Sequence, residues 1–410
     1  MILPEKIQPG DFDYLLPPER IAQYPQANRD ESRLLILQDG VIREDLFRQV
    51  GRYIPASSLL VFNDTRVIRA RLIFSKETGA TIEVFCLEPL LPPEPGTALQ
   101  AKGSVIWKCL VGNVKRWRSG VIRKDLQHGS NAVVLTAEKL EDLGEGCFSI
   151  RFSWSPETLS FAEILEHMGR VPLPPYITRA PAELDADRYQ TVYARADGSV
   201  AAPTAGLHFT PEILAQLRAA NIEFGQVTLH VGLGTFRPVS TPDISAHIMH
   251  REKILVPLEL IRRLIREPDK KVIAAGTTTV RTLESLYWTG VKILREERMP
   301  ELSVRQWDPY EKKYAAGIPV AEALEALTDH LAKEGTHEFS GNTELMIVPG
   351  YRFRLTGGLI TNFHLPQSTL LMLVAALAGK EWKSAYDYAL DHGFRFLSYG
   401  DACLFFPARK

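Results

Sequence analysis

One stretch in the second half of the chain decides the fold class: Val272-Ile-Ala-Ala-Gly276-Thr-Thr-Thr-Val-Arg281-Thr-Leu-Glu-Ser-Leu286. The four apolar residues Val272–Ala275 have the length and composition of a short buried strand. A glycine and three threonines follow, and Val280–Leu286 then has a helical pattern. Strand, loop and helix in this order form the repeating unit of an α/β domain.

The same order of elements recurs on both sides of this stretch. Leu359–Phe363 leads through His364-Leu-Pro into a helix opened by Ser368, and Leu370–Leu377 is apolar on every side, which predicts a buried helix. Thr210-Pro211-Glu212 has the hydroxyl, proline and acid of a helix start. Further strands are expected at Leu34–Leu37 and Leu59–Phe62, and amphipathic helices at Pro257–Arg266 and Val320–Leu331.

Residues 69–152 differ from this pattern, because short β-forming runs follow one another without a helical period. The runs are Thr81–Leu87, Val105–Val111, Ala132–Leu135 and Cys147–Phe152, and Pro89–Gly96 is expected to be a surface loop. The sequence therefore predicts an α/β fold: a larger, discontinuous α/β domain (residues 1–68 and 153–410) with a small antiparallel β-barrel domain (residues 69–152) inserted into it.

Composition excludes several classes of protein. The 410 residues carry 48 basic and 49 acidic side chains, so any contact with nucleic acid must come from a local basic patch. Cys86, Cys109, Cys147 and Cys403 are far apart and form no CxxC pair, which argues against a disulfide framework or a cysteine zinc site. We expect no metal, because the helical spacing of His247 and His250 lacks an obvious third ligand. No signal peptide or membrane-spanning stretch is recognisable, so a cytoplasmic protein is expected.

Polar clusters follow many of the predicted strands. They are Asn63–Arg66, Pro203–Thr210, Thr228–Arg237, Gly276–Arg281, Thr361–His364 and Ser398–Asp401. Any one of them can be turn or cap chemistry. Because ligands of α/β domains gather beyond the carboxyl ends of strands, six clusters together favour an active site built from loops.

A basic stretch lies within the predicted β-domain. Lys115, Arg116, Arg118, Arg123 and Lys124 are close in sequence and surround Trp117. Cationic and aromatic side chains in this arrangement suit phosphate contact and base stacking, and a solvated surface turn is the competing interpretation.

Familiar catalytic motifs are absent: no P-loop, zincin or nucleophile-elbow pattern is found. Instead, long strings resemble the S-adenosylmethionine:tRNA ribosyltransferase-isomerase family of queuosine biosynthesis nearly end to end. These strings include Phe12-Asp-Tyr-Leu-Leu-Pro, Phe62-Asn-Asp-Thr-Arg66, Val200-Ala-Ala-Pro-Thr-Ala-Gly-Leu-His208, Leu229-His-Val-Gly-Leu-Gly-Thr-Phe-Arg237, Gly276-Thr-Thr-Thr-Val-Arg281 and Thr361-Asn-Phe-His-Leu-Pro-Gln-Ser368. Residues 90–104 and 295–338 are longer than the usual pattern.

The resemblance implies a cytoplasmic enzyme with no metal or redox cofactor and S-adenosylmethionine as co-substrate. We expect it to be a monomer. It would transfer and isomerise the ribosyl group of that co-substrate onto 7-aminomethyl-7-deazaguanine at the wobble position of tRNA, releasing adenine and methionine. A base near neutral pKa would remove the proton of C5′ that the sulfonium acidifies, so that adenine leaves, the aminomethyl nitrogen attacks, and epoxide closure releases methionine.

Candidate roles follow from these chemical needs. His208, His230 and His364 are the candidate bases, and Asp64, Glu284 and Asp401 are the carboxylates that could face the sulfonium or the amines. Arg66, Arg237 and Arg281 could hold a carboxylate or RNA phosphates. The remaining candidates for substrate binding are Thr204, Gly206, Thr235, Thr277, Thr278 and Asn362, and those for tRNA binding are the five cations of the basic stretch.

Two other functions remain open from the residues. A methyltransferase using the same donor would need a glycine-rich strand–helix turn, which is not found. A non-catalytic tRNA-binding protein would account for the basic stretch but not for so many polar strand ends.

Overall fold

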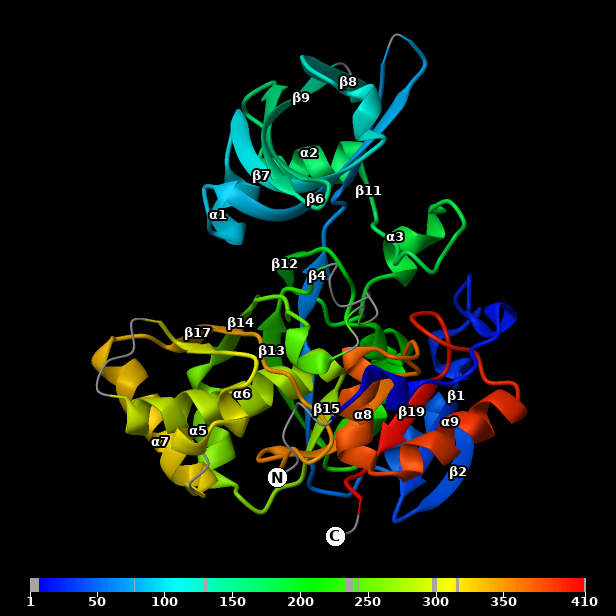
Figure 1. Cartoon of the computed structure of the whole chain (residues 1–410), viewed down its shortest axis with the longest axis vertical. Coiled ribbons are helices and arrows are strands. Elements are labelled where there is room, and N and C mark those ends of the chain that lie inside the picture. Colours follow the sequence, from blue (N-terminus) through cyan, green and yellow to red (C-terminus); the bar gives the residue numbers. More distant parts are fainter. Residues whose placement is uncertain are drawn as a thin grey trace.

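The computed structural model describes residues 7–76, 78–128, 131–232, 239, 241, 243–296, 301–314 and 317–408. It is a mixed α/β structure with a large sheet at one end and a curled antiparallel sheet at the other (Figure 1). In spatial order, the ten described strands of the large sheet are β16 (Ser303–Val304), β17 (Glu338–Thr343), β14 (Glu252–Pro257), β13 (Glu223–Leu229), β3 (Leu59–Asn63), β15 (Val272–Ala275), β18 (Thr356–Asn362), β19 (Ala402–Phe405), β1 (Arg33–Gln38) and β2 (Val41–Leu46).

Four neighbouring strands at the centre of this sheet, β13, β3, β15 and β18, run parallel. β3 and β15 are buried along their whole length, as expected for strands with both faces covered. The carboxyl ends of these four strands therefore meet at the same edge of the sheet, which is where ligands bind in open α/β sheets.

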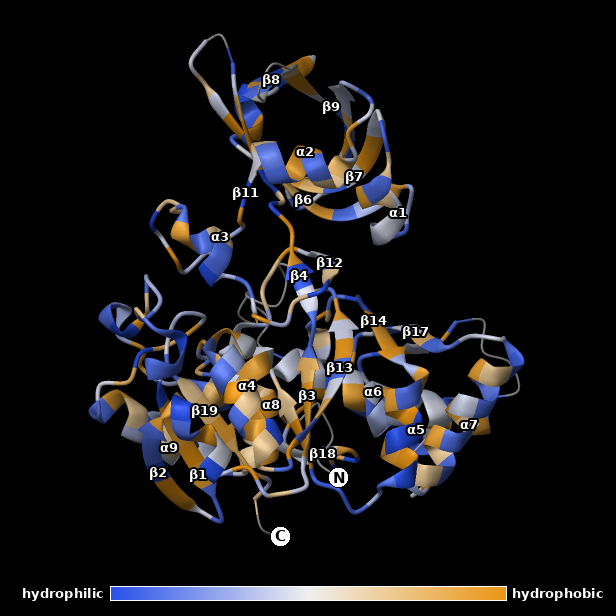
Figure 2. Ribbon diagram, turned by 180° about the vertical axis from the view of Figure 1, so that it is seen from behind, coloured by the Kyte–Doolittle hydropathy of each residue, from blue (hydrophilic) through white to orange (hydrophobic). Residues whose placement is uncertain are grey.

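Helices pack around the large sheet. Those described are α4 (Pro211–Ala219), α5 (Leu258–Arg266), α6 (Thr277–Arg295), α7 (Val320–Lys333), α8 (Thr369–Ala378) and α9 (Glu381–Asp391). α5, α6 and α7 gather beside β13 and β14, whereas α8 and α9 lie beside β19 and β1 (Figure 1). In Figure 2 the central strands are mostly hydrophobic, and α5 alternates between hydrophobic and hydrophilic positions.

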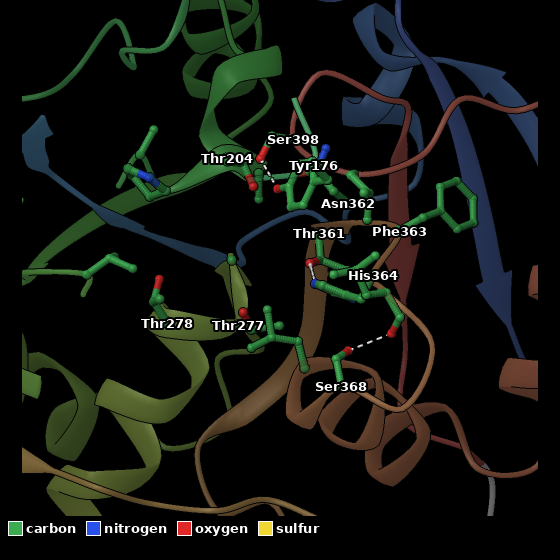
Figure 3. A pocket seen from close by; sticks show the side chains of 18 residues that line it. Tyr176, Thr204, Thr277, Thr278, Thr361, Asn362, Phe363, His364, Ser368 and Ser398 are labelled. Atoms are coloured by element: carbon green, nitrogen blue, oxygen red, sulfur yellow. Dashed lines mark hydrogen bonds between the residues drawn. The ribbon is translucent and has the colours of Figure 1, made fainter. Parts of the chain in front are cut away.

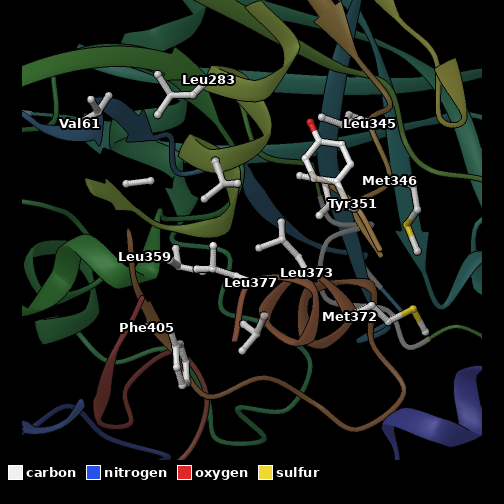
Figure 4. Packing of buried hydrophobic residues seen from close by; sticks show 14 of the residues in the cluster. Val61, Leu283, Leu345, Met346, Tyr351, Leu359, Met372, Leu373, Leu377 and Phe405 are labelled. Carbon is white, nitrogen blue, oxygen red and sulfur yellow. The ribbon is translucent and has the colours of Figure 1, made fainter. Parts of the chain in front are cut away.

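Each predicted helix is found, and all except α6 have bounds close to those expected. The Thr210 side chain caps α4 by accepting from the Ile213 amide at 3.3 Å. α8 is buried on nearly every side, as its apolar sequence predicts, and Leu373 and Leu377 pack in one cluster with Val61 and Leu359 (Figure 4). α6 is much longer than the predicted segment, because its 19 residues extend from Thr277 to Arg295.

The curled sheet contains the β-rich region. Its seven described strands are, in spatial order, β11 (Gly169–Arg170), β5 (Arg71–Ser75), β6 (Thr81–Leu91), β7 (Ser104–Gly112), β10 (Cys147–Ser155), β9 (Asn131–Gly144) and β8 (Val121–His128). Every described pairing in it is antiparallel. α2 (Phe161–Met168) packs into its core with Phe161, Ile164 and Leu165.

The Pro89–Gly96 segment differs from its prediction as a loop. Residues 89–91 complete β6, and Pro95 is the first residue of α1 (Pro95–Gln100). The fixed φ of proline suits the first position of a helix, so a proline-rich segment can begin one. Two further strands, β4 (Thr65–Val67) and β12 (Ala196–Ser199), pair in parallel between the two sheets, and α3 (Leu184–Arg188) lies in the same region (Figure 1).

Candidate functional site

A pocket lies at the edge of the large sheet where the parallel strands end. Its empty volume is about 660 Å³, with the open mouth included. It brings together Thr204 and Ala205 of the 3-10 turn η7 (Thr204–His208), Gly276–Thr278 at the start of α6, and Thr361–His364 at the end of β18 (Figure 3). Ser398 and Val231 come from two more of the predicted clusters. We call this cavity the central pocket.

The close packing of η7 depends on a glycine. A Cβ at Gly206 would lie 2.0 Å from the hydroxyl oxygen of Tyr193 and 2.7 Å from Cγ2 of Thr191. Gly206 does not line the central pocket, so its role is to let η7 approach these two side chains. Gly276 has φ of +100° immediately before α6, a conformation that favours glycine and turns the chain from β15 into the helix.

His208 is buried behind the central pocket and touches it through Asn362. Nε2 of His208 lies 3.0 Å from Nδ2 of Asn362, and the ring packs against Phe47 with centroids 5.1 Å apart. Burial, together with the nearby charges of Arg29 and Arg395, lowers the pKa of His208 to about 3. This pKa is far below the near-neutral value that the reaction asks of its base, because the fold removes the ring of His208 from water.

His364 is the histidine that lines the central pocket. Its Nε2 lies 3.2 Å from the Thr361 hydroxyl, and its Nδ1 lies 3.4 Å from the Tyr386 hydroxyl. Its backbone carbonyl accepts from the Tyr14 hydroxyl. Burial lowers the pKa of His364 to about 3, so the imidazole is neutral at pH 7 and its unprotonated nitrogen can accept a hydrogen bond.

His230 lies in a second cavity, which adjoins the central pocket at Val231. This charged cleft, about 1240 Å³ with its open space, is also lined by Glu94, Arg251 and Lys253. Nδ1 of His230 is 3.0 Å from the Thr65 hydroxyl, and burial with the charge of Lys253 lowers the pKa of His230 to about 4. Glu94 pairs with Lys253, which joins the segment before α1 to the large sheet.

Asp64 follows β3 directly but does not line either cavity. Its Oδ1 accepts from the Thr228 hydroxyl at 2.7 Å, and burial raises its pKa. Arg66, two residues on, is exposed and lies 3.8 Å from Asp197. It lines a different cleft, between the two sheets, together with Arg69.

Three predicted binding residues are held in buried structural contacts away from the central pocket. Arg281 pairs with Glu252 and donates from Nε to the Leu345 carbonyl at 3.0 Å. Glu284 accepts from three consecutive backbone amides, of Arg354, Leu355 and Thr356. Asp401 accepts from the backbone amides of Arg33 and Arg395, at 2.9 and 2.8 Å.

Of the remaining predicted residues, Thr204, Thr277, Thr278 and Asn362 all line the central pocket. Thr235 and Arg237 lie outside the described residues. Within the described ranges there is no group of three metal-ligating side chains and no helix long and apolar enough to cross a membrane.

Comparison with known proteins identifies the family. A model of the queuosine biosynthesis protein family matches residues 10–405. The chain belongs to this family. It is 41% identical to the S-adenosylmethionine:tRNA ribosyltransferase-isomerase of Trichlorobacter lovleyi, over 96% of this chain and 98% of that one. It is equally similar to the enzyme of that name from Thermotoga maritima, at 41% identity over the same shares of the two chains.

A solved structure is also similar to this member of the queuosine biosynthesis family. It is the crystal structure of S-adenosylmethionine tRNA ribosyltransferase from Thermotoga maritima, at 31% identity and a TM-score of 0.45. The similarity covers 96% of this chain and 99% of that chain.

Some pocket residues of this family member were not among the sequence candidates. Tyr176 and Ser398 share a hydrogen bond of 2.5 Å although they are 222 positions apart, and both line the central pocket. Ser398 and Thr361 begin clusters visible in the sequence, whereas Tyr176 follows two prolines in a segment with no polar cluster. Ser368 was expected only as the cap of α8, a role it also has, since it accepts from the Leu371 amide at 3.2 Å.

The basic stretch separates into two parts in the structure. Lys115, Arg116 and Arg118 are exposed and line one surface cavity with Lys76. Arg123 pairs with Asp125 at 2.7 Å, and Lys124 donates to the Met168 carbonyl at 2.7 Å. Trp117 is fully buried and its indole donates to the Gly120 carbonyl, so the expected base stacking on this ring is wrong.

Proposed function

We propose that this chain is an S-adenosylmethionine:tRNA ribosyltransferase-isomerase. It transfers and isomerises the ribosyl moiety of S-adenosylmethionine onto 7-aminomethyl-7-deazaguanine at the wobble position of tRNA, and the products are epoxyqueuosine-tRNA, adenine and methionine. The observation that carries this proposal is the similarity to enzymes of that name along nearly the whole chain. The central pocket supports it, because the strings that resemble the family supply most of its polar residues.

The arrangement of the histidines bears on the proton transfer. His364 lines the central pocket and His230 lines the adjoining charged cleft, so both can reach a bound substrate. His208 contacts Asn362 and lines a separate small cavity with Arg29 and Arg188. We therefore assign proton abstraction to His364 or His230, and a positioning role to His208.

The tRNA interface that we propose is the exposed part of the basic stretch with one added residue. This basic patch comprises Lys76, Lys115, Arg116 and Arg118, which surround one cavity at the end of the curled sheet. Arg123 and Lys124 are left out because they do not line this cavity. Arg123 pairs with Asp125 instead, and Lys124 donates to the Met168 carbonyl. The hairpin between β5 and β6 lies at the end of the molecule remote from the large sheet, so the patch would contact RNA far from the reacting base (Figure 1).

We also propose that the curled sheet closes as a barrel and forms a domain inserted in the larger one. Lys124 belongs to β8 at one edge of this sheet, and its partner Met168 adjoins β11 at the other edge. The buried members of one hydrophobic cluster lie between Ile68 and Met168 in the sequence, with the addition of Val200. We therefore place the end of the small domain near Arg170, beyond the residue 152 expected from sequence.

The remaining features of the proposal follow from the reaction. The enzyme would act as a monomer in the cytoplasm, where its tRNA substrate is found, with S-adenosylmethionine as co-substrate and no metal or redox cofactor.

The test is a product analysis with S-adenosylmethionine labelled in the adenosine and methionine parts, and tRNA that carries the 7-deazaguanine amine. We expect free adenine and methionine in equal amounts, and both only when the modified tRNA is present. Accumulation of S-adenosylhomocysteine would indicate a methyltransferase. Binding of tRNA without any turnover of the donor would indicate a binding protein, and either result would overturn the proposal.

A further inference from the structure

The chemistry of the central pocket suits a neutral ligand group. None of its described lining side chains is a carboxylate, an ammonium or a guanidinium. Hydroxyls of threonine and serine, one carboxamide and one neutral imidazole are set among apolar walls that include Val231, Leu365 and Leu397. An ammonium or sulfonium group buried here would lose its hydration without gaining an anionic partner. The charged cleft on the other side of Val231 offers such partners, because Arg251, Lys253 and Glu94 line it.

The orientation of the Asn362 carboxamide is set by the groups behind it. Nδ2 lies 3.4 Å from the Asp401 carbonyl oxygen, which can only accept, so the amino group of the carboxamide faces that oxygen. Nδ2 also lies 3.0 Å from Nε2 of His208, which must then be the unprotonated nitrogen of that ring. The carboxamide oxygen on the opposite side has no hydrogen-bond partner in the described chain, although Asn362 is only 3% exposed.

His208 preserves this orientation at neutral pH. Burial lowers its pKa to about 3, so the ring stays neutral and keeps an acceptor toward Asn362. A protonated ring would present an N–H to the amino group of Asn362 and would oppose the arrangement. His208 is thus a positioning residue that acts through Asn362.

We propose that the central pocket is the subsite for the adenine base of the donor, and that the carboxamide oxygen of Asn362 accepts a hydrogen bond from its exocyclic amine. The assignment rests on the function proposed above. Adenine is planar and uncharged, with apolar faces and an amino group that supplies the donor Asn362 lacks. The zwitterionic methionine part then extends toward the charged cleft. The first amides of α6, which have no intrahelical acceptor, lie at the pocket and would stabilise negative charge on the departing base.

The test measures binding of free bases to the full chain by calorimetry, with and without the acceptor tRNA. The probes are adenine, unsubstituted purine, hypoxanthine and L-methionine. We expect adenine to bind at least about tenfold more tightly than purine or hypoxanthine, because a buried acceptor left without a donor is unfavourable. Methionine should bind independently of adenine. Equal affinities for adenine and purine, or competition between methionine and adenine, would overturn the assignment.

Substitution of Asn362 tests whether this residue causes the preference for adenine over purine. Asn362→Ala should lower adenine affinity about tenfold and bring the ratio of adenine to purine affinity near one, while methionine affinity is unchanged. The control is Asn28→Ala, an exposed asparagine that does not line the central pocket, which should retain the wild-type ratio. A folded Asn362→Ala protein with the wild-type ratio would overturn the role of Asn362. If that variant does not fold, the ligand series on the wild-type protein decides the assignment.

Product analysis separates this inference from the proposed function. Release of adenine and methionine without discrimination between adenine and purine would leave the function standing and overturn the subsite. Selective adenine binding without turnover on the modified tRNA would overturn the function, and with it the role of this pocket in ribosyl transfer.

Discussion

Glu284 was predicted to bind substrate because of its negative charge, but in the structure its carboxylate makes hydrogen bonds that stabilise the fold. Its carboxylate is fully buried and accepts from three consecutive amides, at 2.8, 3.1 and 3.0 Å, and from the Tyr351 hydroxyl at 2.9 Å. These bonds tie the segment that enters β18 to the middle of α6. A carboxylate so engaged has no capacity left for a substrate amine.

Replacing Glu284 with glutamine should therefore destabilise the protein. The new amino group would face N–H donors, and the charge-assisted bonds would be removed, at a cost of about 3 kcal/mol in the free energy of unfolding. Urea unfolding at pH 7 measures this. Glu325→Gln, on the exposed side of α7, is the matched control and should change stability by less than about 0.5 kcal/mol. A Glu284→Gln protein of wild-type stability would contradict the structural role.

The buried histidines predict a loss of stability in acid. Burial lowers the pKa of His208 and His364 to about 3 and that of His230 to about 4. Below their unfolded pKa of about 6.5, the unfolded chain binds protons that the native state does not, so the free energy of unfolding falls as the pH decreases. Each histidine contributes up to about 1.4 kcal/mol per pH unit between about 6.5 and its native pKa.

Comparison of two proteins isolates this effect, because Asp64 and Asp401, whose pKa is raised by burial, act in the opposite sense. Urea unfolding of the wild type and of His364→Gln at pH 7, 6 and 5 should give a shallower pH dependence for the variant. The difference between the two slopes of unfolding free energy against pH should approach the value for one bound proton, about 1.4 kcal/mol per pH unit. Parallel curves would show that His364 is not held neutral in the native state.

At the scale of elements, the crossing of α6 and α7 depends on the absence of a side chain at Gly290. A Cβ there would lie 1.9 Å from the Ala323 carbonyl oxygen and 2.5 Å from its carbon. Both atoms belong to the backbone of α7, so no rotamer change can relieve the contact. The long α6 that carries the central pocket at its start is fixed by this crossing near its other end.

Gly290→Ala should therefore destabilise the protein despite the better helix propensity of alanine. That propensity gives about 1 kcal/mol, whereas separating two packed helices costs about 3 kcal/mol, so we expect a net loss of about 2 kcal/mol. Thermal unfolding measures the change. Gly96→Ala in α1 is the control, since no atom lies within 4 Å of its Cβ position, and it should not lower the melting temperature. A more stable Gly290→Ala protein would contradict the close crossing.

At the scale of the whole molecule, the two ends have different tasks in the proposed function. The central pocket lies at the large sheet, and the basic patch lies on the curled sheet. With a net charge of −1, the molecule as a whole does not attract RNA, so the patch must act locally. Substitutions in the patch should therefore change tRNA affinity without changing the chemical step.

Replacing Lys115, Arg116 and Arg118 with alanine should weaken tRNA binding and reduce the slope of log K against log salt. The expected reduction is about 0.7–0.9 for each phosphate that the patch no longer neutralises, while kcat at saturating tRNA stays within about twofold. Salt titrations of tRNA binding measure it. Arg262→Ala, an exposed cation on α5, is the control and should leave the slope unchanged. An unchanged slope in the triple variant would mean that the patch is an ordinary solvated surface.

The sequence by itself determined the main strands and helices around the central pocket and their order. Val272–Leu286 predicts β15 and the start of α6, and Leu359–Phe363 and Leu370–Leu377 predict β18 and α8, because hydrophobic period and caps act within a few residues. It also indicated that polar strand ends would meet, since parallel strands place their carboxyl ends at one edge. The strings in these segments that resemble the family also allowed the function to be predicted without any knowledge of tertiary contacts.

Only the tertiary structure decided which of those polar residues face a ligand. Thr277 and Thr278 line the central pocket, whereas Arg281 and Glu284 of the same helix are engaged by Glu252 and by backbone amides from residues 354–356. Tyr176 reaches the pocket from a segment without any local signal, because it bonds a serine 222 positions away. Burial and hydrogen-bond partners depend on distant parts of the chain, so neither the pKa of His208 nor the orientation of Asn362 could be predicted from local sequence.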